Sequence, residues 1–207
     1  MALRRIVLSV LSVTLATAAV FPLHAAQRSQ PPPVTTVTPL PPPATQLEDL
    51  LTRPGALVTR DLYRVTDQLA VNFGLVIDAV IATEVVPTSS RLQGLRVEVS
   101  ARGAPDRTRT SYVDLGELAG LSQAVTQMMT VASQWTGRED SRSMEAQFMT
   151  AGSFVIGFHQ DIRTQQGFVA AGAVDPARHP CNVQDFVIIK TAIDDAIALL
   201  KNKGGRP

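Results

Sequence analysis

The sequence predicts an α+β fold, in which one or two antiparallel sheets carry two principal helices. Several short segments alternate apolar and polar side chains or are almost wholly apolar, as strands are. Two longer segments repeat apolar residues every three or four positions, as amphipathic helices do. Apolar residues make up 45% of the 207-residue chain and charged residues 18%, which is typical of a globular domain.

The first 26 residues are predicted to be a secretory signal peptide. Arg4 and Arg5 supply its positive charge, an apolar run follows over residues 6–23, and small residues suited to cleavage end it at Ala25 and Ala26. We therefore expect the protein to be exported, to the periplasm or the extracellular space. The alternative is an uncleaved membrane anchor, because a run of this length is at the lower limit for crossing a bilayer.

A proline-rich linker is predicted over residues 27–46, because seven of the 14 prolines lie between Pro31 and Pro43. Proline fixes φ and donates no backbone hydrogen bond, so this segment is expected to be extended polyproline II. A single α+β domain is predicted over residues 47–203, and residues 204–207 are expected to form a disordered tail.

The first half of the predicted domain contains four strand candidates. The clearest of them places Leu95, Val97 and Val99 on one face and charged or polar residues on the other, which indicates a half-buried strand. A longer and more apolar candidate is predicted to be central in its sheet. The candidates are residues 62–66, 73–84, 92–102 and 107–113.

The second half contains three strand candidates. The tripeptide Ala151-Gly152-Ser153 is typical of a hairpin turn between two of them. A third strand is expected to follow in the same group. The candidates are residues 143–150, 154–161 and 166–174.

The two helical segments are predicted over residues 114–135 and 185–203. In the first, Asp114 is expected to cap the helix and Glu117 to complete a capping box. Apolar positions of the two segments match at a constant spacing of 71 residues, and each segment closes a group of strands. The match indicates a unit of three or four strands and a helix that occurs twice. The alternative is chance, because any two amphipathic helices share a stripe.

The apolar stripes of the two helices also predict which side chains are buried. Val125 in the first helix and Ile193 and Leu200 in the second are expected to point into the core. Asp194 and Asp195 fall off the second stripe and are expected to face away from the core.

This succession of strands and a helix resembles the ββββα units of the Whirly and Pur-alpha families, which bind single-stranded nucleic acid. The resemblance covers the fold outline, and no nucleic-acid-contacting residue of those families can be matched in this chain. The chain also departs from them in charge, because removing Arg4 and Arg5 from the 19 basic residues leaves 17 against 18 acidic ones. Aromatic residues amount to only 5%, which leaves few side chains for base stacking. We therefore predict no nucleic-acid partner.

The tripeptide His179-Pro180-Cys181 holds the chain's one cysteine and one of the two histidines outside the signal peptide. A cysteine thiolate activated by histidine is a nucleophile. Such dyads normally converge from distant segments, however, and neighbouring side chains on an extended chain diverge. The simpler interpretation is a packed or partly exposed thiol beside a surface histidine, without catalysis.

A metal site would have to combine His159, Asp161, His179 and Cys181. His159 and Asp161 share one face of a predicted strand whose other face is apolar, so His159 is expected to face solvent or a groove. Their spacing matches no established zinc motif, and we predict no metal and no cofactor. These four residues remain weak candidates for any site.

Two isolated carboxylates, Asp78 and Glu145, lie in predicted strands. Asp78 lies within an apolar strand, where burial would raise its pKa and suit it to acid–base chemistry. The simpler interpretation is that Asp78 and Glu145 face water on a one-sided sheet.

The residue inventory favours a non-catalytic exported domain that binds a protein or a small ligand in the cell envelope or outside it. No nucleophile elbow, phosphate loop, zinc-protease motif or EF-hand loop is present in the sequence. The alternative is a small exported hydrolase that uses a histidine and a carboxylate. Contact with a membrane is expected only if the signal peptide is not cleaved.

Overall fold

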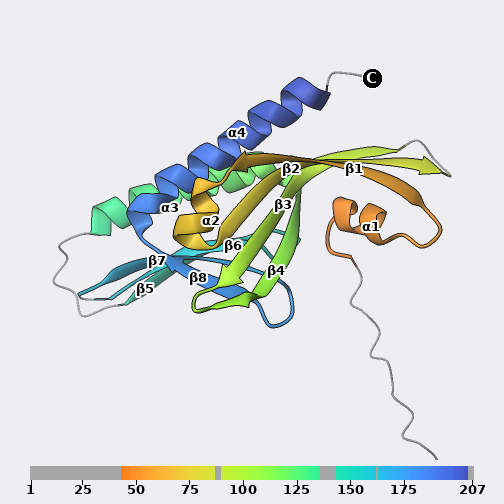
Figure 1. Ribbon diagram of the computed structural model, residues 1–207. Helices are drawn as coiled ribbons and strands as arrows, with labels where there is room; N and C mark the ends of the chain where they lie inside the picture. The colour runs from red at the N-terminus through yellow and green to blue at the C-terminus, as the bar shows by residue number, and fades with distance from the viewer. Residues whose placement is uncertain (1–42, 87–89, 136–142, 162, 205–207) are drawn as a thin grey trace, which may run out of the picture. The chain divides into compact units, whose positions relative to one another are not determined.

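The computed structural model describes residues 43–86, 90–135, 143–161 and 163–204 of the chain (Figure 1). The predicted signal peptide and most of the predicted linker lie outside the described residues. Within the described residues, no helix combines the length and the apolar character needed to cross a membrane.

The first half of the described chain is a four-stranded antiparallel sheet, sheet A, in which neighbours in sequence are neighbours in space. A single 3-10 turn and a long helix follow its last strand (Figure 1). Short helices precede its first strand and separate its first two strands. The elements are α1 (Gln46–Thr52), β1 (Leu57–Thr66), α2 (Gln68–Phe73), β2 (Leu75–Val86), β3 (Arg91–Ala101), β4 (Ala104–Asp114), η1 (Leu115–Glu117) and α3 (Leu118–Trp135).

The second half repeats this plan with shorter strands. Its four strands form a second antiparallel sheet, sheet B, again in sequence order, and a 3-10 turn and a long helix follow. The elements are β5 (Met144–Met149), β6 (Val155–Gln160), β7 (Gln165–Ala171), β8 (Ala177–Cys181), η2 (Val183–Asp185) and α4 (Phe186–Gly204).

The two antiparallel sheets and two principal helices confirm the predicted α+β class and the duplicated unit. The predicted spacing of 71 residues is wrong by one helical turn, because α3 begins at Leu118 and α4 at Phe186, a spacing of 68. At that spacing every buried position of α3 meets a buried position of α4. The pairs are Leu118 with Phe186, Leu121 with Ile189, Val125 with Ile193, Met128 with Ala196, and Ala132 with Leu200.

The main core lies between the inner faces of the two sheets and the apolar stripes of α3 and α4. The predicted alternation of β3 is confirmed, because Leu95, Val97 and Val99 are fully buried there. β2 lies between β1 and β3, as predicted for a central strand. The two long helices contact each other, and a hydrogen bond of 2.6 Å from Ser122 to Asp194 joins them.

The outer face of sheet A carries a smaller core beneath α1. Leu47 and Leu50 of this helix pack on Val80 and Ala82 of β2. Asp78 lies on the same outer face, but it is only 2% exposed, so the expectation that it faces water is wrong. The reason is a pair of arginines on the neighbouring strands, with Arg64 Nε 2.5 Å and Arg96 Nε 3.6 Å from the Asp78 carboxylate.

The predicted capping of the first long helix is also wrong. Asp114 makes no side-chain cap there, because its carboxylate accepts the backbone N–H groups of Gln46 and Leu47, which are distant in sequence. Glu117 likewise accepts the N–H of Ala151. A capping box does form at the start of the second helix, between Asn182 and Asp185.

Candidate functional site

A polar cleft of about 310 Å³ lies where the two halves meet at the start of α4. It contains two of the four candidate site residues, His179 and Cys181, together with polar side chains from other segments. Six of its nine lining residues are polar. The lining residues are Asn72, Phe73, Arg102, Gln166, His179, Pro180, Cys181, Asn182 and Asp185.

A larger hollow of about 580 Å³ lies beside α1, on the outer side of sheet A. Its charged residues Asp49 and Arg53 already pair with each other at 2.7 Å, and Arg53 also pairs with the buried Glu84. The polar groups of this hollow are therefore engaged in holding α1, and we take the polar cleft as the candidate site.

Strand β8 places His179 and Cys181 on the same face of sheet B. His179 lies opposite Val169 and Cys181 opposite Gly167 on β7, while Pro180 between them points the other way. The expectation that the two side chains diverge is thus wrong, because residues two apart in a strand share a face. Pro180 is tolerated since, among the described strands, β8 pairs with β7 alone and lies at the edge of sheet B.

The His179 ring is fixed by a hydrogen bond across the two halves. Its Nδ1 lies 2.9 Å from the carbonyl oxygen of Ser100 at the end of β3. A carbonyl oxygen only accepts, so Nδ1 carries the proton and Nε2 of the neutral ring keeps a free lone pair. Gly74 makes room for the ring, because a Cβ there would lie 2.7 Å from Nδ1. Gly74 also adopts a left-handed φ of 55°, which glycine favours.

The Cys181 thiol is packed, and its pKa is raised. The residue is 8% exposed, and burial, with a smaller contribution from the charge of Asp185, raises the pKa of this thiol to about 12. Because the thiolate is the nucleophilic form, almost none is present at neutral pH. Cys181 therefore forms part of the wall of the cleft as a neutral thiol.

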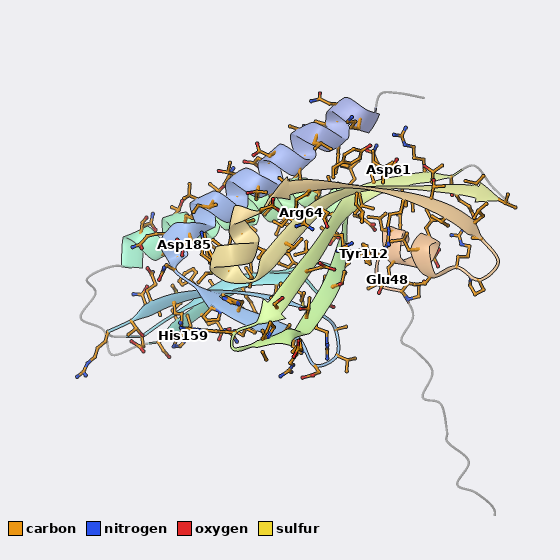
Figure 2. The ribbon with its side chains drawn as sticks, viewed as in Figure 1. Glu48, Asp61, Arg64, Tyr112, His159 and Asp185 are labelled. Atoms are coloured by element: carbon orange, nitrogen blue, oxygen red, sulfur yellow. The ribbon has the colours of Figure 1, made fainter. Side chains whose placement is uncertain are left out.

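The capping box at the start of α4 forms another wall of the cleft. The backbone N–H of Asn182 donates to Asp185 Oδ2 at 2.9 Å, and the Asn182 side chain accepts the backbone N–H of Asp185. Figure 2 shows Asp185 where the chain turns into α4. Both side chains are thereby fixed in place before any ligand arrives.

Three further polar residues reach the cleft from separate segments. Asn72 comes from the end of α2, Arg102 from the turn between β3 and β4, and Gln166 from β7. Arg102 is exposed and forms no ion pair with any of the described acidic residues. The cleft thus presents a guanidinium, an imidazole, a carboxylate and three amides.

His159 and Asp161 do not join the other two candidates. His159, labelled in Figure 2, is exposed on β6, as the sequence predicts. The strand register places it on the opposite face of sheet B from His179. Asp161 holds the turn after β6, accepting the backbone N–H groups of Arg163 and Thr164 at 2.8 and 2.7 Å. These hydrogen bonds lower the pKa of Asp161. Among the residues that the structure describes, no three His, Cys, Asp or Glu side chains gather as a metal site would require.

Glu145 is exposed on β5, opposite His159 on β6, and faces water as predicted. Sequence reasoning missed five polar residues of the cleft: Asn72, Arg102, Gln166, Asn182 and Asp185. The spacing of Asn182 and Asp185, which is that of a capping box, was the only usable signal, because the other three converge through tertiary structure alone.

Comparison of the chain with protein-family models, with curated proteins and with solved structures finds no match.

Proposed function

We propose that this protein is an exported, non-catalytic binding domain and that the polar cleft at the start of α4 is its binding site. The observation that supports this proposal most directly is the fixed ring of His179, whose Nδ1 is held by Ser100 while Nε2 keeps a lone pair. A side chain held in one orientation by a second residue binds a ligand without losing further conformational freedom.

Binding is favoured over hydrolysis by the chemistry of the lining. The cleft has no serine or threonine among its nine lining residues, and its thiol has a pKa of about 12. The one carboxylate, that of Asp185, caps α4 and does not orient His179. A base without a nucleophile or an orienting acid does not make a hydrolytic site.

The polar lining also favours one class of ligand. Amides, a guanidinium and an imidazole recognise hydrogen-bonding and charged groups, and only Phe73, Pro180 and Cys181 offer apolar surface. The proposed ligand is therefore polar, either a small molecule or part of a protein. Export follows from the predicted signal peptide, and N-terminal sequencing of the protein from its source would test it, because a chain that begins at Met1 contradicts cleavage.

His179 offers a direct test of ligand binding. In the mature protein, the Cε1–H resonances of His159 and His179 report on opposite faces of sheet B. We expect at least one compound among free amino acids, dipeptides and sugar phosphates to move the His179 resonance and leave that of His159 in place. Equal movement of both, or movement of neither by any compound, would contradict the proposal.

A further inference from the structure

The duplicated unit makes it possible to compare the cleft with the corresponding place in the first half. Val113 lies opposite Leu95, and Cys181 lies opposite Gly167, and each is the last buried residue of the strand that precedes a long helix. These registers fix the pairs of equivalent residues. The pairs are Ser111 with His179, Asp114 with Asn182, Glu117 with Asp185, Gly94 with Gln166, and Val97 with Val169.

The contacts between the two halves follow the same equivalence. Ser111 Oγ accepts the backbone N–H of Gly172 at 3.1 Å, and His179 Nδ1 donates to the Ser100 carbonyl at 2.9 Å. Ser100 and Gly172 are themselves equivalent, since each lies three residues after the pair Val97 and Val169. Each half is therefore joined to the other by its last strand, through the end of the partner's third strand.

The residues that precede the second strand of each sheet, β2 and β6, are equivalent as well. Ile77 lies opposite Val97 and Ile156 opposite Val169, so Gly74 is equivalent to Ser153. Both adopt a left-handed backbone, with φ of 55° and 63°. The residues just before them, Phe73 and Gly152, are therefore equivalent too. We call the contact region at the start of α3 the first joint, and the polar cleft at the start of α4 the second joint.

The first joint is filled by residues 45–47 of the same chain, which we call the N-terminal segment. The backbone N–H groups of Gln46 and Leu47 donate to Asp114 at 2.8 and 3.0 Å. The Leu47 side chain lies against Gly94, where an added Cβ would come within 2.5 Å of Leu47 Cδ1.

The same segment also touches the second half. An added Cβ at Gly152 would lie 3.1 Å from the Thr45 methyl. The segment therefore contacts Asp114, Gly94 and Gly152. Their three equivalents, Asn182, Gln166 and Phe73, all line the open cleft.

We propose that the second joint is also a docking site for a polypeptide segment, and that the segment carries a carboxylate. The proposal rests on the proposed function of the cleft and names its ligand. Asn182 stands where Asp114 accepts the backbone N–H groups of Gln46 and Leu47 in the first joint, so its side-chain oxygen is placed to accept such a group from a segment. Asp185 stands where Glu117 accepts the N–H of Ala151, and its Oδ2 already accepts the N–H of Asn182. The partner is another polypeptide, because residues 45–47 already occupy the first joint.

The carboxylate is inferred from an unmatched charge. At the first joint, the turn between β7 and β8 carries Asp175, which is paired with Arg107 and Arg109. At the second joint, the corresponding turn between β3 and β4 carries Arg102, which has no ion-pair partner among the described residues and lines the cleft. An acidic side chain or a C-terminal carboxylate would pair with this guanidinium.

The lining also favours a polar side chain over a leucine like the one that fills the first joint. Gln166 stands where Gly94 leaves room for Leu47, so a polar side chain takes the position beside which a leucine packs in the first joint. The segment that docks there is therefore polar as well as acidic.

The test uses the mature protein and the labelled peptide Ac-Ala-Gln-Glu-Asp-Gln-Ala-amide. The uncharged control peptide is Ac-Ala-Gln-Gln-Asn-Gln-Ala-amide. Binding is followed by fluorescence anisotropy and by the His179 resonance. We expect the Kd of the acidic peptide to be at least about tenfold lower than that of the uncharged peptide. The reason is that the uncharged peptide cannot form the charge-assisted hydrogen bond to Arg102. Arg102→Gln should abolish this difference, whereas Arg163→Gln, which changes an exposed arginine on the turn after β6, should preserve it.

The result separates this inference from the proposed function. If N-acetylaspartate or free glutamate moves the His179 resonance and the acidic peptide does not, the cleft binds small molecules and the peptide inference is overturned. If Arg102→Gln leaves peptide binding unchanged, the inference is overturned as well. If neither the peptides nor the small molecules move the His179 resonance, both the peptide inference and the proposed function are contradicted.

Discussion

The two joints between the halves share one backbone plan and differ in what fills them. At the first, the N-terminal segment docks on Asp114 and Leu47 lies in the space that Gly94 leaves. At the second, Gln166 stands at the position equivalent to Gly94, and a cleft of about 310 Å³ lined mainly by polar groups remains. The repeated unit has two equivalent positions, of which one anchors α1. The other is free of that structural task, and its side chains are the ones we propose for binding.

The largest expected effects concern the helices that close the two halves. Leu121 in α3 and Leu200 in α4 are fully buried, so Leu121→Ala and Leu200→Ala should each lower the free energy of unfolding by about 2–5 kcal/mol. Asp195→Ala, an exposed change, should cost no more than about 0.5 kcal/mol in the same urea titration. A large loss of unfolding free energy for one variant and none for the other would show that α3 and α4 do not pack on their sheets in the same way.

Asp194 lies off the apolar stripe of α4, as Asp195 does, but it is unsuitable as the exposed control variant. Its carboxylate accepts hydrogen bonds from Ser122 of α3 at 2.6 Å and from Lys190 at 2.5 Å. Partial burial opposes its ionisation, but these two hydrogen bonds prevail and lower the pKa of Asp194. The sequence correctly predicts which face of α4 is buried, but it does not indicate that Asp194 forms a hydrogen bond with Ser122 of α3.

The buried thiol predicts a loss of stability at alkaline pH. The pKa of Cys181 is raised in the folded chain from 9.0 to about 12, so above pH 9 the unfolded chain ionises while the folded chain keeps the thiol neutral. The free energy of unfolding should fall by up to about 1.4 kcal/mol per pH unit between those values.

Cys181→Ala is the matched variant for this measurement. It costs stability at every pH, but it should reduce the alkaline slope of the urea midpoint relative to the parent. Val113, the equivalent of Cys181 in the first half, does not titrate, so the extra slope is specific to the second joint. An unchanged slope in Cys181→Ala would mean that the thiol is exposed enough to ionise normally.

A smaller effect is expected when the two equivalent polar residues are removed. Asp114→Ala leaves two backbone N–H groups of α1 without their acceptor and should cost about 1–3 kcal/mol. Asn182→Ala removes only a cap of α4 and should cost about 1 kcal/mol. Hydrogen exchange at the Leu47 amide distinguishes them, because it should accelerate only in Asp114→Ala. Similar exchange in both variants would contradict the docking of α1 on Asp114.

Much of the fold is predictable from the sequence because most elements carry their own periodicity. β3 and the two long helices are amphipathic over their whole length, and the turn at residues 151–153 is marked by small residues. β8 was missed because its residues Ala177–Cys181 include an arginine, a histidine and a proline, which do not alternate as a strand does. α1 and α2 were missed since seven and six residues are too few for a helical pattern.

The candidate site was less predictable than the fold. His179 and Cys181 stood out by residue type, but their neighbours Asn72, Arg102 and Gln166 come from three separate segments. Asp114 was assigned to the wrong helix, because its carboxylate serves backbone groups 67 and 68 residues away. Such long-range use of a side chain leaves no trace in local spacing.

The orientation of His179 tests the account of the cleft most directly. A long-range 1H–15N spectrum of the mature protein, recorded where the ring is neutral, distinguishes the two tautomers. The hydrogen bond to the Ser100 carbonyl predicts that His179 carries its proton on Nδ1 and leaves Nε2 unprotonated, whereas the exposed His159 should show mainly the ordinary Nε2–H form. A His179 ring protonated on Nε2 would contradict the cross-joint hydrogen bond and, with it, the fixed lone pair on which the proposed binding site depends.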